Sequence, residues 1–62
     1  MIRIELSKLR RGDFFRLSDN DGSPLWVRGY YVHNERKYEV YKYDNVCHEG
    51  FMRGTRMVFI EV

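Results

Sequence analysis

The sequence predicts an all-β fold, a small and twisted five-stranded barrel with little or no helix. Two aromatic and β-branched runs, residues 25–32 and 37–43, flank a short polar segment at residues 33–36 and predict a central β-hairpin. The other apolar runs are short and are separated by segments rich in turn-forming residues. With 62 residues, the chain is expected to form one domain, 1–62, which leaves no room for a second domain or a deep catalytic cleft.

The first strand is predicted from three apolar residues that alternate with charged ones, namely Ile2, Ile4 and Leu6. Residues 7–12 are too short for a true helix and predict a single helical turn or tight bend. Ser7 is placed to cap its start, and Gly12 is placed to adopt the left-handed conformation that ends it.

Residues 13–18 predict the second strand, with Phe15 and Leu17 on one face and Phe14 and Arg16 on the other. Residues 19–24 contain nearly every type of turn-forming residue and predict a loop. Its Asp-x-Asp-Gly fragment does not fit a calcium loop, because the glycine is fourth in the run rather than sixth.

The central hairpin divides into two faces according to the length of its turn. A two-residue turn at residues 35–36 or 34–35 leaves Arg28 and Glu39 on the outer side, whereas a three-residue turn exchanges the face of one whole strand. We prefer the two-residue turn, because it directs the Val/Tyr set inward. The predicted inner face is Val27, Gly29, Tyr31, Tyr38 and Val40; the predicted outer face is Trp26, Arg28, Tyr30, Tyr41 and Tyr43.

The C-terminal part is expected to hold a connection followed by the last strand. Residues 44–55 lack sustained periodicity and predict a long connection anchored by Val46 and Phe51. Residues 56–62 are apolar on both faces, as in a strand that closes a small barrel or pairs with a neighbour. The predicted core consists of Leu9, Phe15, Leu17, Val27, Tyr31, Tyr38, Val40, Val58 and Ile60.

The residue pattern predicts no enzyme, no metal site and no cofactor. Cys47 and His48 are adjacent, and adjacent side chains of an extended segment point apart, so neither can activate the other. One cysteine with two histidines is short of the four ligands of a structural zinc site. The carboxylates of Asp13, Glu39, Asp44 and Glu49 have no spacing that places two of them together.

Charge and cysteine content favour an intracellular binding role. Cys47 is the only cysteine, which favours a reducing, cytoplasmic setting. The first six residues interleave charged and apolar side chains, and we expect neither a signal peptide nor a membrane span there. The net charge of +2 is mild for a nucleic-acid-binding protein.

The chain resembles the opening of small SH3-like barrels in Leu9-x-x-Gly12-Asp13-x-Phe15, an acidic turn and Trp26-Val-Arg28. It also resembles a group of short, uncharacterised bacterial proteins through Gly12-Asp13-x-Phe15, Val27-Arg28, Lys37-Tyr38, Asp44 and Phe51-x-x-Gly54. The resemblance implies a five-stranded SH3-like barrel and carries no activity with it. The run Ala-Leu-Tyr of peptide-binding SH3 domains and the glycine-centred motif of ribosomal barrels are both missing.

The outer hairpin face is the candidate binding site. Its residues are Trp26, Arg28, Tyr30, Tyr41 and Tyr43, with Arg16 and Lys42 at the rim. Aromatic residues and arginine are enriched at protein interfaces, so a protein partner or a homo-oligomer is the first hypothesis. The same residue types stack on bases and hold phosphates, so a single-stranded nucleic acid is the second. A third interpretation is that both faces only fill the core.

Overall fold

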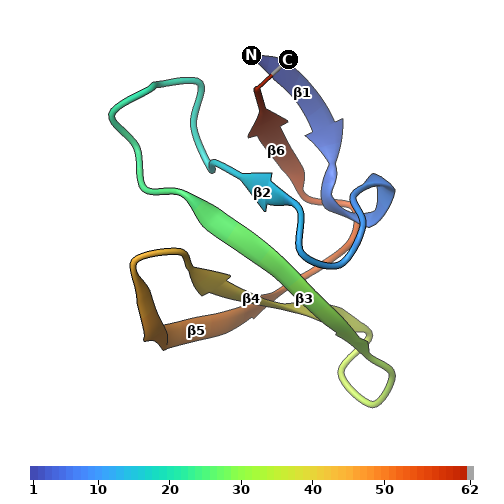
Figure 1. The fold of residues 1–62 in the computed structure, drawn as a ribbon. Coiled ribbons are helices and arrows are strands. Elements are labelled where there is room, and N and C mark those ends of the chain that lie inside the picture. Colours follow the sequence, from blue (N-terminus) through green and yellow to red (C-terminus); the bar gives the residue numbers. More distant parts are fainter. Residues whose placement is uncertain (62) are drawn as a thin grey trace.

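The computed structural model describes residues 1–61, except for the side chains of residues 45–49. It confirms an all-β fold with a single short 3₁₀ turn, η1 (Leu6–Lys8), among the described residues. The strands are β1 (Ile2–Glu5), β2 (Phe14–Phe15), β3 (Trp26–Val32), β4 (Lys37–Lys42), β5 (Asn45–Met52) and β6 (Met57–Ile60) (Figure 1).

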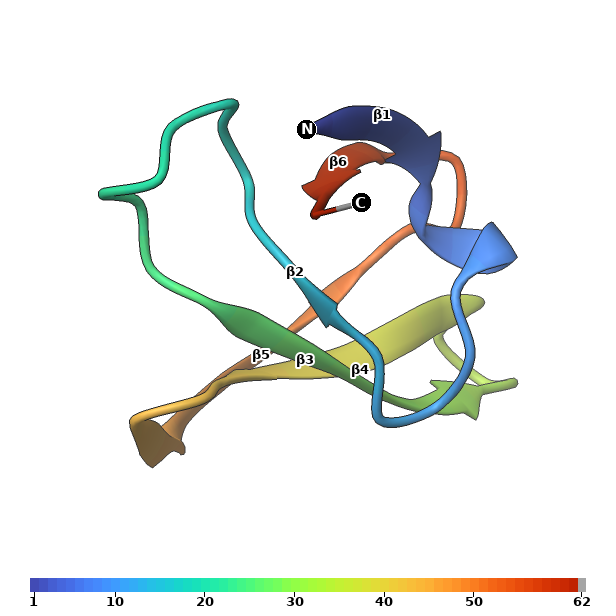
Figure 2. The same ribbon diagram turned by 45° about the horizontal axis from the view of Figure 1, so that its top comes forward.

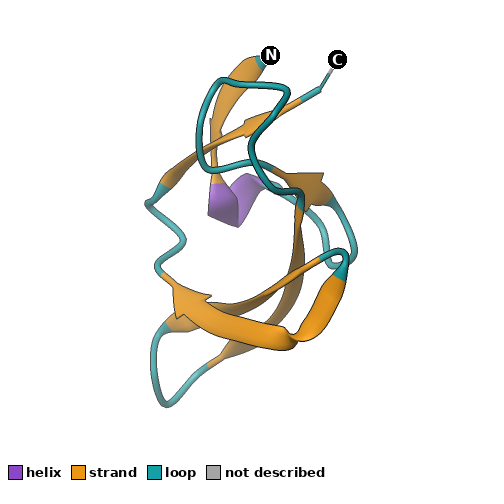
Figure 3. Ribbon diagram, turned by 90° about the vertical axis from the view of Figure 1, so that its left-hand side faces the viewer, coloured by secondary structure: helices purple, strands orange, loops and turns teal. Residues whose placement is uncertain are grey.

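The strands form two antiparallel sheets that are not closed into a barrel. One sheet pairs β1 with β6, and the other has the order β2-β3-β4-β5. Figure 2 shows β1 and β6 side by side, set apart from the larger sheet. A single bridge joins the sheets: Arg16 and Phe59 exchange two backbone hydrogen bonds of 2.8 and 2.9 Å. The predicted closed barrel of five strands is therefore not observed, although the strands curve around a common interior (Figure 3).

The N-terminal segment follows the sequence-based expectation closely. β1 is half of a two-stranded ribbon, and η1 is the predicted single turn, closed by the Leu9 N–H, which donates to the Leu6 carbonyl at 3.1 Å. Ser7 does not cap the turn; Glu5 occupies that position without a side-chain hydrogen bond. Gly12 has the expected positive φ, 93°.

The second strand is shorter than predicted. β2 covers Phe14 and Phe15 rather than residues 13–18. The chain then changes partner: Phe15 pairs with Trp26 of β3, whereas Arg16 bridges to Phe59 of β6. Regular pairing with the larger sheet therefore ends at Phe15. Phe15 is buried and Phe14 is half exposed, as alternation requires.

A β-bulge in β3 corrects the predicted faces of the hairpin. The residues nearest the turn follow the prediction, because Tyr31 pairs with Tyr38 and Val32 pairs with Lys37. The register then shifts between Arg28 and Tyr31, so that Gly29 and Tyr30 together face the single residue Glu39. Because of the bulge, the β3 residues that precede it point to the opposite face of the sheet from the one predicted.

Before the bulge, Trp26 therefore lies on the inner face and Val27 on the outer face. Trp26 pairs with Lys42, and Arg28 pairs with Val40, whose side chain is completely buried in the core. Val27 pairs with Phe14 on one side and Tyr41 on the other. It is buried, but it lies outside the main core cluster.

Residues 45–52 form a strand, β5, where the sequence predicted a long connection. Tyr43 and Asp44 make the turn from β4, and Lys42 pairs with Asn45 across it. After an irregularity the two strands pair again from Tyr41 to Tyr38. Phe51 does not anchor this segment, because it is 53% exposed. The side chain of Val46, the other predicted anchor, lies outside the described residues.

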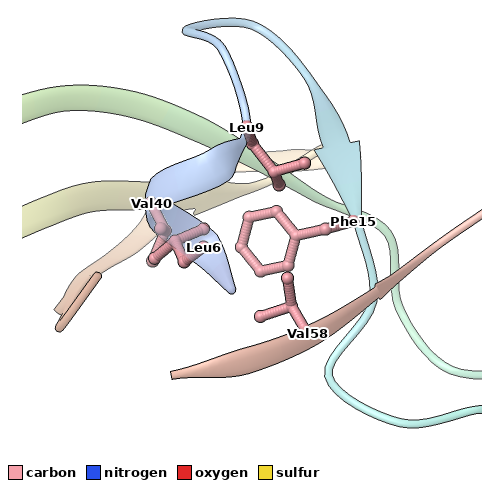
Figure 4. Close-up of a cluster of buried hydrophobic side chains, with 5 residues drawn as sticks. All are labelled: Leu6, Leu9, Phe15, Val40 and Val58. Carbon is pink, nitrogen blue, oxygen red and sulfur yellow. The ribbon is translucent and has the colours of Figure 1, made fainter. Parts of the chain in front are cut away.

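The core lies between the larger sheet, η1 and β6. Phe15 is at its centre, surrounded by Leu6, Leu9, Val40 and Val58 (Figure 4). Leu17, Tyr38 and Ile60 pack against this cluster while half-buried, which agrees with the predicted core. One predicted core residue is wrong, because Tyr31 is 40% exposed, and the predicted core omits Leu6, which is completely buried.

Candidate binding surfaces

The predicted site residues do not form one surface. Trp26, Arg28 and Lys42 share the inner face of the larger sheet, whereas Tyr41 and Tyr43 belong to its outer face. Tyr30 is at the bulge and is 63% exposed. The division follows from the bulge, because it places Trp26 opposite Phe15 and Lys42, on the side of the core.

The three inner residues are engaged in packing. Trp26 packs against the core cluster, and the Lys42 ammonium lies 5.8 Å from the centre of its ring. The guanidinium carbon of Arg28 lies 4.1 Å from the centre of the Tyr38 ring, a cation–π contact. The Arg28 Nε atom is buried and has no hydrogen-bond partner in the described part of the chain. These side chains stabilise the fold rather than offer a stacking surface to a ligand.

Arg16 also differs from its predicted role as a rim residue. Its Nη1 atom donates to the Glu61 carboxylate at 2.7 Å, and its Nε atom donates to the Ser23 carbonyl at 3.3 Å. The side chain thereby ties the 19–24 loop to the end of β6. It also borders a recess of about 330 Å³ that is lined by Phe14, Leu25 and Phe59.

The outer face of the larger sheet carries an aromatic surface, which we call the outer patch and define as Phe14, Val27, Tyr41 and Tyr43. The register places Phe14, Val27 and Tyr41 in one row across β2, β3 and β4. The rings of Phe14 and Tyr43 meet edge to face, with centroids 5.3 Å apart. Phe14 is 49% exposed and Tyr43 is 60% exposed, so the rim of this patch is open to solvent around buried Val27.

Sequence analysis missed Phe14 and Val27 as members of this surface. Val27 was placed in the core because the bulge was not foreseen. The signal for Phe14 was present, since strand alternation put it on the face opposite Phe15. Phe51 is not part of this patch. It was not predicted as an exposed ring because it belongs to β5, a strand that the sequence did not reveal, where it pairs with Glu39 of β4.

Tyr30 forms a separate exposed feature. The guanidinium carbon of Arg11 lies 4.6 Å from the centre of its ring. Gly29 beside it is buried, and a Cβ atom there would come within 3.0 Å of the Glu39 carbonyl oxygen. The bulge thus requires glycine at this position because the two strands approach closely.

The described side chains contain no group of three His, Cys, Asp or Glu residues that could hold a metal ion. Asp13 serves the turn before β2, where its carboxylate accepts the backbone N–H of Arg10 at 2.8 Å. The side chains of Cys47, His48 and Glu49 lie outside the described residues. Within residues 1–61, no helix has the length and apolar character needed to cross a membrane.

Comparison of the chain with protein-family models, with curated protein sequences and with solved structures finds no significant match.

Proposed function

We propose that this protein is a small, non-catalytic binding module that uses the outer patch to bind protein, and that a second copy of the chain is its partner. The observation that carries the proposal is the group of aromatic side chains, Phe14, Tyr41 and Tyr43, around Val27 on the face of the larger sheet that points away from the core. A one-sided antiparallel sheet normally directs polar side chains to solvent on this face. Exposed aromatic residues there are typical of an interface.

The character of the outer patch favours a second copy over a charged partner. Its four residues are uncharged, and on the same face of β4 as Tyr41 the nearest charged residue is Glu39, at the bulge. Two such patches can pack against each other as in a β-sandwich about 10 Å thick, and the four side chains that each patch buries carry no charge. A standard interface buries about 800 Å² per partner. That is about one sixth of this chain's 4593 Å² of accessible surface, which one sheet face can supply.

Sedimentation velocity from micromolar to millimolar concentration tests the proposal. We expect a dimer, and we expect the double variant Phe14→Ser/Tyr43→Ser to shift the protein to monomer. The control is Tyr30→Ser, which removes an equally exposed aromatic ring outside the outer patch and should leave the dimer intact. A monomer at millimolar concentration, or equal loss of dimer in both variants, contradicts self-association through this face.

We also propose two finer features: an SH3-like architecture, which the sequence resemblance implies, and a cytoplasmic setting. The pairing of β1 with β6 and the curvature of the strands around one interior support the architecture (Figure 3). The presence of a single cysteine in the sequence supports a reducing compartment.

A further inference from the structure

Two adjoining recesses lie between the β3–β4 turn and the connection from β5 to β6. The larger has a volume of about 670 Å³ and the smaller about 290 Å³, and they share Lys37, Arg53 and Thr55. Arg36 contributes to the first recess and Arg56 to the second. We call the continuous depression the basic groove and define its cations as Arg36, Lys37, Arg53 and Arg56.

Two turns bring these cations together. In the β3–β4 turn, the Arg36 N–H donates to the His33 carbonyl at 3.2 Å, and Arg36 has a φ of 54°. In the β5–β6 connection, the Arg56 N–H donates to the Arg53 carbonyl at 3.1 Å. This second turn is fixed to the body of the protein, because the Leu6 and Ser7 N–H groups donate to carbonyls within it at 2.9 and 3.0 Å.

A glycine allows the connection to lie against the hairpin. A Cβ atom on Gly54 would come within 2.9 Å of the Tyr38 ring and 3.0 Å of the Ser7 Cβ atom. The floor of the larger recess is therefore formed where Gly54 meets Tyr38, and Tyr31 packs against Tyr38 with ring centroids 4.9 Å apart. The groove is a built feature of packed elements rather than a gap between loops.

The basic groove holds the net positive charge of the whole protein. Its four cations and one acidic residue, Glu35, give a formal charge of +3, whereas the whole chain carries +2. The remaining residues together carry −1. Among the described residues the only ion pair is Arg16 with Glu61, so none of the described carboxylates forms an ion pair with a groove cation.

Aromatic rings accompany these cations. Tyr31 borders the larger recess and is 40% exposed, and Phe51 borders the smaller recess and is about half exposed. Guanidinium groups bind phosphate through paired N–H donors, and exposed rings accept unpaired bases by stacking. The four cations can bind successive phosphates, and the two exposed rings beside them can stack on bases. This combination of residues suits a single-stranded nucleic acid.

We propose that the basic groove binds single-stranded nucleic acid, with phosphates on Arg36, Lys37, Arg53 and Arg56 and bases on Tyr31 and Phe51. This site differs from the predicted nucleic-acid surface, whose Trp26 and Arg28 face the core. It shares no residue with the outer patch, and a groove with a charge of +3 repels an identical groove, so self-association should not use it. The function it adds is a second binding activity on the same small domain.

Fluorescence anisotropy with a labelled mixed-sequence 12-nucleotide single strand tests this proposal. With four phosphate contacts and a salt slope of about −0.7 per contact, affinity should fall about 50-fold between roughly 50 and 200 mM salt. The double variant Arg36→Asn/Arg53→Gln should bind more weakly and reduce the slope by about 1.4. Asparagine is chosen at position 36 because it tolerates positive φ.

The matched control is Arg3→Gln/Arg10→Gln, which removes the same net charge from exposed residues outside the groove and should leave the slope unchanged. A third variant, Phe51→Ser, should weaken binding at least about fivefold without changing the slope, because it removes stacking and no charge. Thermal melts confirm that each variant is folded.

Absence of binding at low salt, or equal loss in the groove and control variants, overturns the proposal. Equal binding of a polyglutamate peptide also overturns it, since the groove would then recognise charge without bases. Unchanged affinity in Phe51→Ser contradicts the placement of a base on that ring.

Discussion

Gly12 has a backbone φ of 93°, a conformation in which a side chain strains the backbone. Its N–H donates to the Arg28 carbonyl at 2.8 Å, so the turn before β2 cannot relax without losing contact with β3. A Cβ atom there meets nothing within 4 Å, so the penalty of substitution lies in the backbone alone. We expect Gly12→Ala to lower the free energy of unfolding by about 1–2 kcal/mol in urea denaturation.

Gly50 provides the control for this prediction. A Cβ atom at Gly50 also meets nothing within 4 Å, and Gly50 does not have a positive φ. Gly50→Ala should therefore be neutral or slightly stabilising, because alanine restricts the unfolded chain. Equal destabilisation by both substitutions would show that the φ of Gly12 is not the cause.

Trp26 is the residue at which the structure and the sequence-based site differ most. Because Trp26 packs on the core cluster, Trp26→Ala should lower the free energy of unfolding by about 3 kcal/mol. Tyr43→Ala removes an aromatic ring that is mostly exposed and should cost less than about 1 kcal/mol. Chemical denaturation of both variants measures the difference. Similar losses would mean that Trp26 is not a core residue.

At the scale of elements, Arg16 links the 19–24 loop and β2 to β6. Its backbone bridges to Phe59, and its side chain binds Glu61 at 2.7 Å. The Arg16 side chain is 15% exposed and that of Glu61 is 65% exposed, so solvent screens the pair strongly. A double-mutant cycle with Arg16→Ala and Glu61→Ala should give a coupling energy below about 1 kcal/mol, which falls as salt is added.

A single Arg16→Ala substitution should cost more than this coupling energy, since it also removes the hydrogen bond to the Ser23 carbonyl and the packing of the side-chain stem. A coupling energy equal to the full cost of Arg16→Ala would assign the whole effect to the ion pair. That outcome would contradict the role of Arg16 as a link between three segments.

The elements also show what the sequence can and cannot predict. Alternation correctly predicted β1 and the opposite orientations of Phe14 and Phe15, and a run that is apolar on both faces correctly predicted β6. The length of the turn correctly predicted that Tyr31 and Tyr38 share a face. The bulge at Gly29 and Tyr30 was not predicted. Gly29 was its only signal in the sequence, because an isolated glycine inside a strand is compatible with a bulge but does not require one. This one inserted residue exchanged the sheet faces of Trp26 and Val27. As a result, the residues of the predicted site are divided between the two faces.

The missed strand has a different cause. Residues 45–52 include three polar residues, Asn45, His48 and Glu49, and a glycine and show no clear period, so they resemble a loop. They form β5 because β4 offers a free edge whose backbone groups need hydrogen-bond partners. The basic groove was missed as well, because its cations come from two segments, residues 36–37 and 53–56, that are distant in sequence and meet only when the strands pair.

At the scale of the whole molecule, the two proposed surfaces differ in their response to salt. The outer patch is uncharged, so its self-association should persist or strengthen as salt rises. The basic groove binds through phosphate contacts, so its affinity should fall steeply. Sedimentation with a labelled single strand at low and high salt should show the dimer retained while the oligonucleotide is released. If the dimer and the bound oligonucleotide were both lost as salt rises, the two binding activities would have to share one charged surface.

Self-association should also add to the stability of a chain with so small a core. Six apolar residues are buried among the described side chains, and a 62-residue domain is marginal on its own. A ligand that binds only the folded state raises its melting temperature with concentration, and a second copy acts as that ligand. The melting temperature should therefore rise between micromolar and millimolar protein in calorimetry. In Phe14→Ser/Tyr43→Ser it should be independent of concentration, and a concentration-independent melting temperature in the unmodified protein would contradict a dimer that contributes to folding.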